Sequence, residues 1–248
     1  MFFPMPQFPP LLPALVIYVL AAVLPAALLL HYICCHDVIE PEPPGLLFLL
    51  ALSGVGAALV ASVLEGFGEW LLNLFLYQGD PLYPILLAFL VVATVEEGVK
   101  FLFLKNQTWN HPAFNYRFDG VVYSAFVSLG FAAFENIYYI FSYGLSVALP
   151  RALLAIPGHL SFSVFMGMYY GRARLKENRR HHVSALVNLW AGYLIAVFLH
   201  GFYDACAMSG TAFATGLFLV FVALMFAAAR RTIKRESETD RPIVRGLR

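Results

Sequence analysis

Three charged side chains, Glu96, Glu97 and Lys100, lie within five residues of one another in a run that is otherwise apolar. A charged group at the centre of a membrane helix costs at least about 2.5–3.5 kcal/mol on insertion scales, so three of them need a reason. One interpretation is a structural ion pair, because either glutamate lies one helical turn from the lysine. The other is a carboxylate that activates water beside a cation. The triplet alone does not decide between them.

Three later apolar segments carry further polar groups: Glu135, His159, and the pair His200 and Asp204. His159 taken alone is best explained as a packing residue. Together, however, acids and histidines on four helices cannot all face lipid, so we expect them to converge inside the bundle. Asp204 follows His200 by four residues, so its carboxylate can hold one ring nitrogen and leave the other pointing into the site. Small neighbours would let the helices approach closely: Gly98, Ala132, Ala133, Gly158 and Gly201.

The composition indicates a membrane protein. The chain has 248 residues, of which 60% are hydrophobic and only 12% charged, and its mean hydropathy is +0.74. A soluble domain of this length would carry more charge. The fold class is therefore predicted to be all-α, a polytopic transmembrane helical bundle. The three cysteines form no disulfide or metal-binding pattern, no nucleic-acid motif is present, and the sequence indicates no oligomeric state.

Seven spanning helices are expected after a proline-rich opening. Their ranges are 11–30, 45–63, 81–104, 120–143, 147–170, 184–207 and 213–229. The segment 65–80 is apolar but short, which favours an interfacial or re-entrant piece, with an eighth helix as the alternative. Residues 1–229 would then form one transmembrane domain, followed by a basic cytoplasmic tail, 230–248, that is predicted to be disordered.

The distribution of positive charge orients the bundle. All but two of the 16 lysines and arginines lie in the segments 105–117, 172–180 and 230–248, and the exceptions are Lys100 and Arg151. These segments follow the third, fifth and seventh helices, so they share one side of the membrane, which the positive-inside rule makes the cytoplasm. The C-terminus is thus expected inside the cell, and with seven helices the N-terminus lies outside.

Three motifs occur in order on successive predicted helices. Glu96 to Lys100 fits Glu-Glu-x-x-Lys, Phe131 to Glu135 fits Phe-x-x-x-Glu, and His200 to Asp204 fits His-x-x-x-Asp. Other intramembrane protease motifs, such as His-Glu-x-x-His, Gly-x-Gly-Asp and Gly-x-Ser-x-Gly, are absent from the sequence. In their order and placement the three motifs resemble the PrsW family of intramembrane proteases, which is related to the prenyl-protein (CAAX) endopeptidases and the bacteriocin-processing enzymes. The resemblance covers a protease-like core at about 84–207.

The resemblance implies an intramembrane protease that cleaves membrane-embedded or membrane-adjacent proteins in the cytoplasmic membrane of a prokaryote. The type example of the family cleaves an anti-sigma factor at the membrane. The partners implied are a membrane protein substrate and the lipid bilayer. Prenyl endopeptidases carry a histidine where this chain has Glu135, which argues against prenyl substrates.

Two versions of the chemistry follow. Without a metal, Glu96 or Glu97 is the general base, Lys100 holds the other glutamate ionised, and Glu135 orients the water or shares a proton. His200, oriented by Asp204, would donate to the oxyanion, with His159 as a second donor or as the acid. With a metal, Glu135, His159 and His200 would bind Zn²⁺ and leave one position for water. Both versions remain open on the sequence.

Two other functional classes use similar residues. A transporter or proton-coupled channel also has buried Glu, Lys and His, but it needs a polar pathway to both faces. A non-catalytic binding protein is the third class, although all three motifs are intact. A shared site also makes a geometric demand: the third helix must continue to about Asn110 if Glu96 is to reach the depth of Glu135 and His200.

Overall fold

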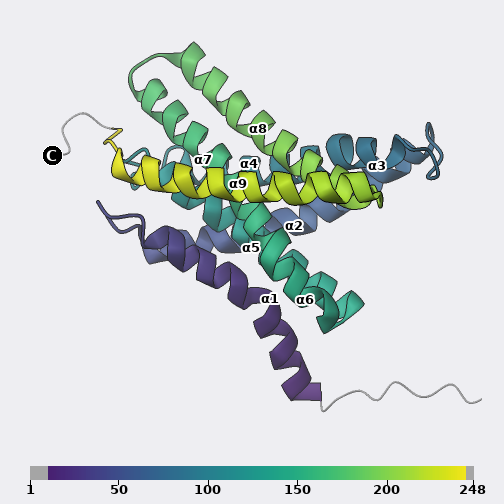
Figure 1. The fold of residues 1–248 in the computed structure, drawn as a ribbon. Coiled ribbons are helices and arrows are strands. Elements are labelled where there is room, and N and C mark those ends of the chain that lie inside the picture. Colours follow the sequence, from purple (N-terminus) through teal and green to yellow (C-terminus); the bar gives the residue numbers. More distant parts are fainter. Residues whose placement is uncertain (1–10, 244–248) are drawn as a thin grey trace, which may run out of the picture.

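The computed structural model describes residues 11–243, so the proline-rich opening and residues 244–248 lie outside the described part of the chain. The described residues are helical apart from their connections, and they form seven long helical units (Figure 1). The units are α1 (Leu11–Cys34), α2 (Pro44–Asn73), the rod of α3 (Tyr83–Leu86), η1 (Leu87–Ala93) and α4 (Thr94–Thr108), α5 (Asp119–Tyr143), the run of η2 (Leu145–Val147), α6 (Ala148–Pro150), η3 (Arg151–Ala155) and α7 (Ile156–Asn178), α8 (His182–Met208), and α9 (Ala212–Glu238).

The expected all-helical polytopic bundle is confirmed. Six of the seven units are long and apolar enough to cross a membrane, and the seventh is the rod that carries the charged triplet. That rod continues to Thr108, within two residues of the end that a shared site requires. The described chain has no separate eighth helix between residues 65 and 80, because α2 continues to Asn73 and the rod begins at Tyr83.

α2 corrects the expected boundary of the second span. The sequence favoured a helix ending near residue 63 and an interfacial piece after it, but α2 continues to Asn73. Glu65 and Glu69 are one helical turn apart in this continuation and line the same cavity. Charged groups on one face do not stop a helix, and residues 64–73 contain no proline that would.

α5 is the central helix of the bundle. Most of its length is buried, and it packs against α1, α2, α4 and α7. Its closest approach is to α2, where a Cβ atom on Gly130 would clash with the carbonyl of Ala51. The tightest contact of the α5 backbone therefore lies beside the site rather than at it, since Gly98 and Gly158 face only aromatic side chains.

Two π-helical segments precede site residues. η1 ends three residues before Glu96, and η3 ends four residues before His159. A π turn holds one more residue than an α turn, so it rotates the side chains that follow relative to those that precede, and such segments are frequent at functional sites. α8 then packs against α7, η1 and α4. This packing brings His200 of α8 towards Glu97 of α4.

One end of the bundle collects the connections after α1, α4 and α7. Asn115 donates to Glu40, Asn178 donates to the carbonyl of Ile243, and Ser237 donates to the carbonyl of His36. Figure 1 shows the C-terminal ends of α1 and α9 on the same side (left). The three basic segments, as far as residue 243, thus share one face, as the charge pattern requires.

The first part of the expected tail is not disordered. α9 continues through residues 230–238, and the chain beyond it packs so that Ile243 is 2% exposed. Glu236, also 2% exposed, pairs with Arg117 at 3.2 Å and with Arg172 at 2.8 Å. These ion pairs, in which only the glutamate is fully buried, hold in place a segment whose composition alone predicts a solvated tail.

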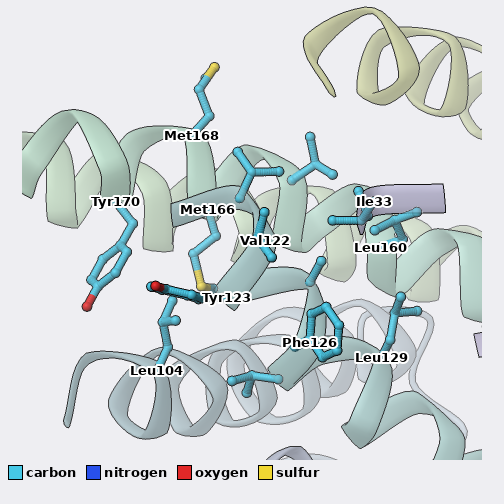
Figure 2. Close-up of a cluster of buried hydrophobic side chains, with 14 of the residues drawn as sticks. Ile33, Leu104, Val122, Tyr123, Phe126, Leu129, Leu160, Met166, Met168 and Tyr170 are labelled. Carbon is cyan, nitrogen blue, oxygen red and sulfur yellow. The ribbon is translucent and has the colours of Figure 1, made fainter. Parts of the chain in front are cut away.

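A cluster of buried apolar side chains lies in the bundle next to this face (Figure 2). Leu104, Tyr123 and Tyr170 meet in it, and each lies within about two turns of the end of its helix at this face. The charged triplet and Glu135 lie further along their helices. The cluster therefore closes the polar region on the side of the basic segments.

Candidate active site

The ammonium group of Lys100 lies at the centre of a buried polar cluster. Its Nζ donates to Glu96 Oε2 at 2.9 Å and to Glu97 Oε1 at 2.8 Å, and it lies 3.1 Å from Nδ1 of His159. None of these four residues is more than 4% exposed. The ion pair expected from the spacing on α4 is thus present, and it is also tied to a histidine of α7.

Glu97 links this centre to α8. Its Oε1 lies 2.9 Å from Nδ1 of His200, whose Nε2 lies 3.3 Å from Asp204 Oδ2. The contact between Asp204 and His200 is therefore the one that their spacing predicts. The second ring nitrogen does not point into open space as expected, because it faces Glu97.

His159 connects the same centre to Glu135 of α5. Its Nε2 lies 3.0 Å from Glu135 Oε2. A lysine ammonium only donates hydrogen bonds, so Nδ1 of His159 must accept from Lys100 and the ring proton resides on Nε2. Nε2 therefore donates to Glu135, and one tautomer satisfies both contacts.

The seven residues singled out in the sequence form one continuous set of contacts. Asp204 contacts His200, which contacts Glu97, and Glu97 and Glu96 both contact Lys100. Lys100 then leads through His159 to Glu135. Four helices contribute to this set, as the cost of isolated polar groups in a membrane predicts.

Aromatic rings cover the charged centre. The ring centroid of Phe131 lies 4.0 Å from Lys100 Nζ, a cation–π contact. Phe162 stacks on His200 with centroids 4.7 Å apart. The Phe-x-x-x-Glu motif thus has a physical basis, because Phe131 covers the ammonium while Glu135, one turn later, receives the histidine.

Two cavities meet at this cluster. One, of about 530 Å³, is lined by polar groups of α4, α5, η3, α7 and α8: Glu96, Glu135, Arg151, His159, His200 and Asp204. The other, of about 510 Å³, lies among α2, η1, α4 and α5. Five residues line both cavities: Glu65, Val92, Glu96, Glu135 and Tyr139. Glu96 and Glu135 therefore face space of the size that ligand sites have, whereas Glu97 and Lys100 line neither cavity.

Two site residues were not selected from the sequence. Arg151 donates to Glu135 Oε2 at 2.8 Å. The sequence could have identified it, because Arg151 and Lys100 are the two basic residues that lie outside the basic segments. Glu65 lines both cavities, and its Oε1 is buried without a hydrogen bond in the described chain. It was missed because residues 65–80 were not assigned to a spanning helix.

Comparisons with known proteins identify the family of this chain. A family model described as "PrsW family intramembrane metalloprotease" matches residues 42–229. The chain belongs to the PrsW family of intramembrane metalloproteases. It is 36% identical to "Protease PrsW" of Geobacillus kaustophilus over 90% of this chain and 93% of that protein. It is 32% identical to "Protease PrsW" of Bacillus subtilis over 74% of this chain and 79% of that protein. No solved structure matches the chain.

Membership of the PrsW family confirms the resemblance drawn from the three motifs. The chain is an intramembrane protease, an integral membrane protein of the bacterial cytoplasmic membrane. The transporter alternative is not favoured, since the matched relatives are named proteases and an apolar cluster closes the polar groups off from one face.

The family description raises the question of a metal. Among residues 11–243, one group of His, Cys, Asp and Glu side chains has its donor atoms within 4.8 Å of one another: Glu96, Glu97 and His159. Two carboxylates and an imidazole are ligands that zinc accepts. The set expected from the sequence, Glu135, His159 and His200, shares only His159 with this group.

The PrsW-family cluster does not fit a metal ion in this arrangement. Nζ of Lys100 contacts all three converging donors, at 2.8, 2.9 and 3.1 Å. An ammonium already neutralises the two carboxylates at that point, and a divalent cation placed beside it would meet like charge. The donors would be available to a metal only if Lys100 moved away.

Proposed function

We propose that this protein is an endopeptidase in which Glu96 activates water for attack on a peptide bond of a membrane-embedded or membrane-adjacent protein. One observation carries the proposal: within the charged triplet, Glu96 alone lines the two cavities, although it is only 4% exposed. Its Oε2 accepts from Lys100, and its Oε1 has no hydrogen bond within residues 11–243. A carboxylate held on one oxygen and open on the other is suited to act as a base.

The proton balance of this mechanism closes on Glu96. The water oxygen attacks the carbonyl carbon of the substrate while the carboxylate takes a proton from the water. When the carbon–nitrogen bond breaks, the protonated carboxyl group returns that proton to the leaving amine. Lys100 fixes the orientation of the carboxylate throughout, and the buried setting strengthens that contact.

The neighbouring residues have supporting roles in this proposal. Glu97, fully buried, holds Lys100 and His200 in place. Glu135 lines both cavities with Glu96, so it is placed to orient the water. Asp204 and His159 fix the positions of His200 and Glu135 through their ring contacts.

The expected substrate is a membrane-embedded or membrane-adjacent protein. The two cavities lie on either side of Glu96 and Glu135 and share these residues as a common wall. A polypeptide that crosses this wall would bring one peptide bond to the carboxylates with chain on both sides. The family resemblance suggests anti-sigma-factor-like proteins. From the charge pattern, we also propose that the C-terminus lies in the cytoplasm.

The test is cleavage of a single-span reporter by the purified full-length protein. Wild type should cut the reporter, and Glu96→Gln, which keeps the shape but cannot take a proton, should lose activity. Glu177→Gln is a matched control, because Glu177 pairs with His182 on the protein surface outside the cavities. The proposal fails if wild type cuts no reporter, or if Glu96→Gln cuts as fast as wild type.

A further inference from the structure

We infer that Arg151 is a further catalytic residue, which donates a hydrogen bond to the carbonyl oxygen of the peptide bond that is cut. The inference rests on the proposed function, since it concerns the same cavity. When water attacks a carbonyl carbon, negative charge develops on its oxygen, and donors aimed at that oxygen are a major source of catalysis. The question is which groups in this cavity still have donors to offer.

The donors expected from the sequence are already engaged. Both ring nitrogens of His200 face carboxylates, those of Glu97 and Asp204. The single ring proton of His159 is donated to Glu135. The three N–H bonds of Lys100 are directed at two carboxylates and His159. None of these groups can contact an oxyanion without giving up a buried contact.

Arg151 has donors to spare. A guanidinium carries five N–H bonds in a planar fork. In Arg151, Nε donates to Asn136 Oδ1 at 2.8 Å and Nη2 donates to Glu135 Oε2 at 2.8 Å, while Nη1 has no hydrogen bond within residues 11–243. The side chain is 15% exposed and lines the larger cavity, which Glu96 also lines. Nη1 is therefore available to a group bound in this cavity, where the substrate carbonyl must lie.

The fork is held rigidly. The guanidinium carbon lies 3.8 Å from the ring centroid of Tyr139, so the plane is fixed by an aromatic face as well as by two hydrogen bonds. Asn136, which is fully buried, donates in turn to the carbonyl of Ala22 on α1. A donor fixed in this way costs no reorganisation when charge develops on the oxygen. Arg151 transfers no proton, so the proton balance through Glu96 is unchanged.

The experiment compares Arg151→Gln and Arg151→Lys with wild type in the reporter assay. Arg172→Gln is the matched control, because Arg172 also pairs with a glutamate, at 2.8 Å, and lies 5.4 Å from an aromatic ring, but on the basic face away from the cavity. We expect Arg151→Gln to lower kcat by about 10²–10³-fold with little change in KM, as loss of an oxyanion donor does. Arg172→Gln should keep the wild-type kcat.

A binding measurement separates a contact with the substrate from a positioning role. A phosphinate analogue of the cut bond mimics the tetrahedral oxyanion, and the uncut reporter serves as the ground-state ligand in a Glu96→Gln background. Arg151→Gln should weaken phosphinate binding by about 10²-fold more than reporter binding, since only the former presents the oxyanion. If phosphinate affinity is unchanged, the inference is overturned even when kcat falls.

Two further outcomes keep the inference separate from the proposed function. If Arg151→Gln does not fold, the Arg151→Lys variant is the test, because a lysine cannot keep the contact to Asn136 and also reach the substrate. Wild-type values of kcat and phosphinate affinity in Arg151→Lys would overturn the inference. If wild type cuts and Arg151→Gln cuts equally well, only the inference fails. If wild type cuts nothing, the proposed function fails first.

Discussion

Nζ of Lys100 and Nδ1 of His159 lie 3.1 Å apart, and this contact joins α4 to α7 at the centre of the polar cluster. With the two glutamates of α4, it gives the ammonium three acceptors for its three N–H bonds. All three N–H bonds of the lysine are therefore used, and the two carboxylates beside it share the positive charge of one ammonium group. That dependence can be measured.

Lys100→Met should destabilise the protein strongly. The change leaves Glu96 and Glu97 buried without a counter-charge, and breaking a buried ion pair in this way typically costs about 3–5 kcal/mol. We expect a lower thermal unfolding temperature in detergent and loss of reporter cleavage. Lys105→Met, on the same helix but without an ion pair in the described chain, is the control. A Lys100→Met protein as stable as wild type would show that the glutamates do not need the lysine.

The two adjacent glutamates should respond differently to the same substitution. Glu96→Gln is expected to lower kcat by about 10²–10⁴-fold, the usual contribution of a general base, with little loss of stability. Glu97→Gln should lower both stability and activity, because Glu97 is fully buried and receives Lys100 and His200. Kinetics and unfolding temperatures measured on the same preparations check this. The opposite pattern, an active Glu96→Gln and a stable but inactive Glu97→Gln, would exchange the roles.

A metal chelator should leave the activity of the purified protease unchanged. The expectation follows from Lys100, whose Nζ takes the point where the donors of Glu96, Glu97 and His159 converge. The measurement is the reporter cleavage rate before and after dialysis against chelator, with and without added zinc. Activity lost on dialysis and restored by zinc would mean that Lys100 leaves the cluster in the working enzyme and that a metal replaces it.

Much of the site could be predicted from the sequence because charge is costly in a membrane. Glu135, His200 and Asp204 were first selected for that reason, and the structure brings them into one cluster. The same reasoning required the helix that carries Glu96 to continue beyond residue 104, and α4 ends at Thr108.

The remaining features depend on packing that no spacing rule contains. Glu65 was expected to begin an interfacial or re-entrant piece, and only the continuation of α2 places it in both cavities. The second nitrogen of His200 was expected to be free, but the approach of α8 to α4 brings it against Glu97. The tail after residue 230 was expected to be disordered from its charge, yet Glu236 pairs with Arg117 in the connection after α4 and with Arg172 of α7.

Acidic side chains at the face of the basic segments should make stability depend on pH. Burial, with Asp240 and Glu40 nearby, raises the pKa of Asp37 to about 6. Burial raises the pKa of Glu42 to about 7, against a hydrogen bond from Tyr123 that lowers it. Between about pH 4 and pH 7 the unfolded chain has released these protons while the folded chain keeps them, so stability should fall as pH rises through this window.

The Glu42 carboxyl group allows this pH dependence to be tested directly. Glu42→Gln has the same shape and cannot ionise, so its unfolding temperature should exceed that of wild type at about pH 7.5, and its pH profile should be flatter. Glu238→Gln is the control, because Glu238 pairs with Lys234 on the surface, where both side chains are well exposed. Wild-type stability that increases between about pH 5 and pH 7.5, or a Glu42→Gln profile parallel to that of wild type, would contradict a buried protonated carboxyl group at this face.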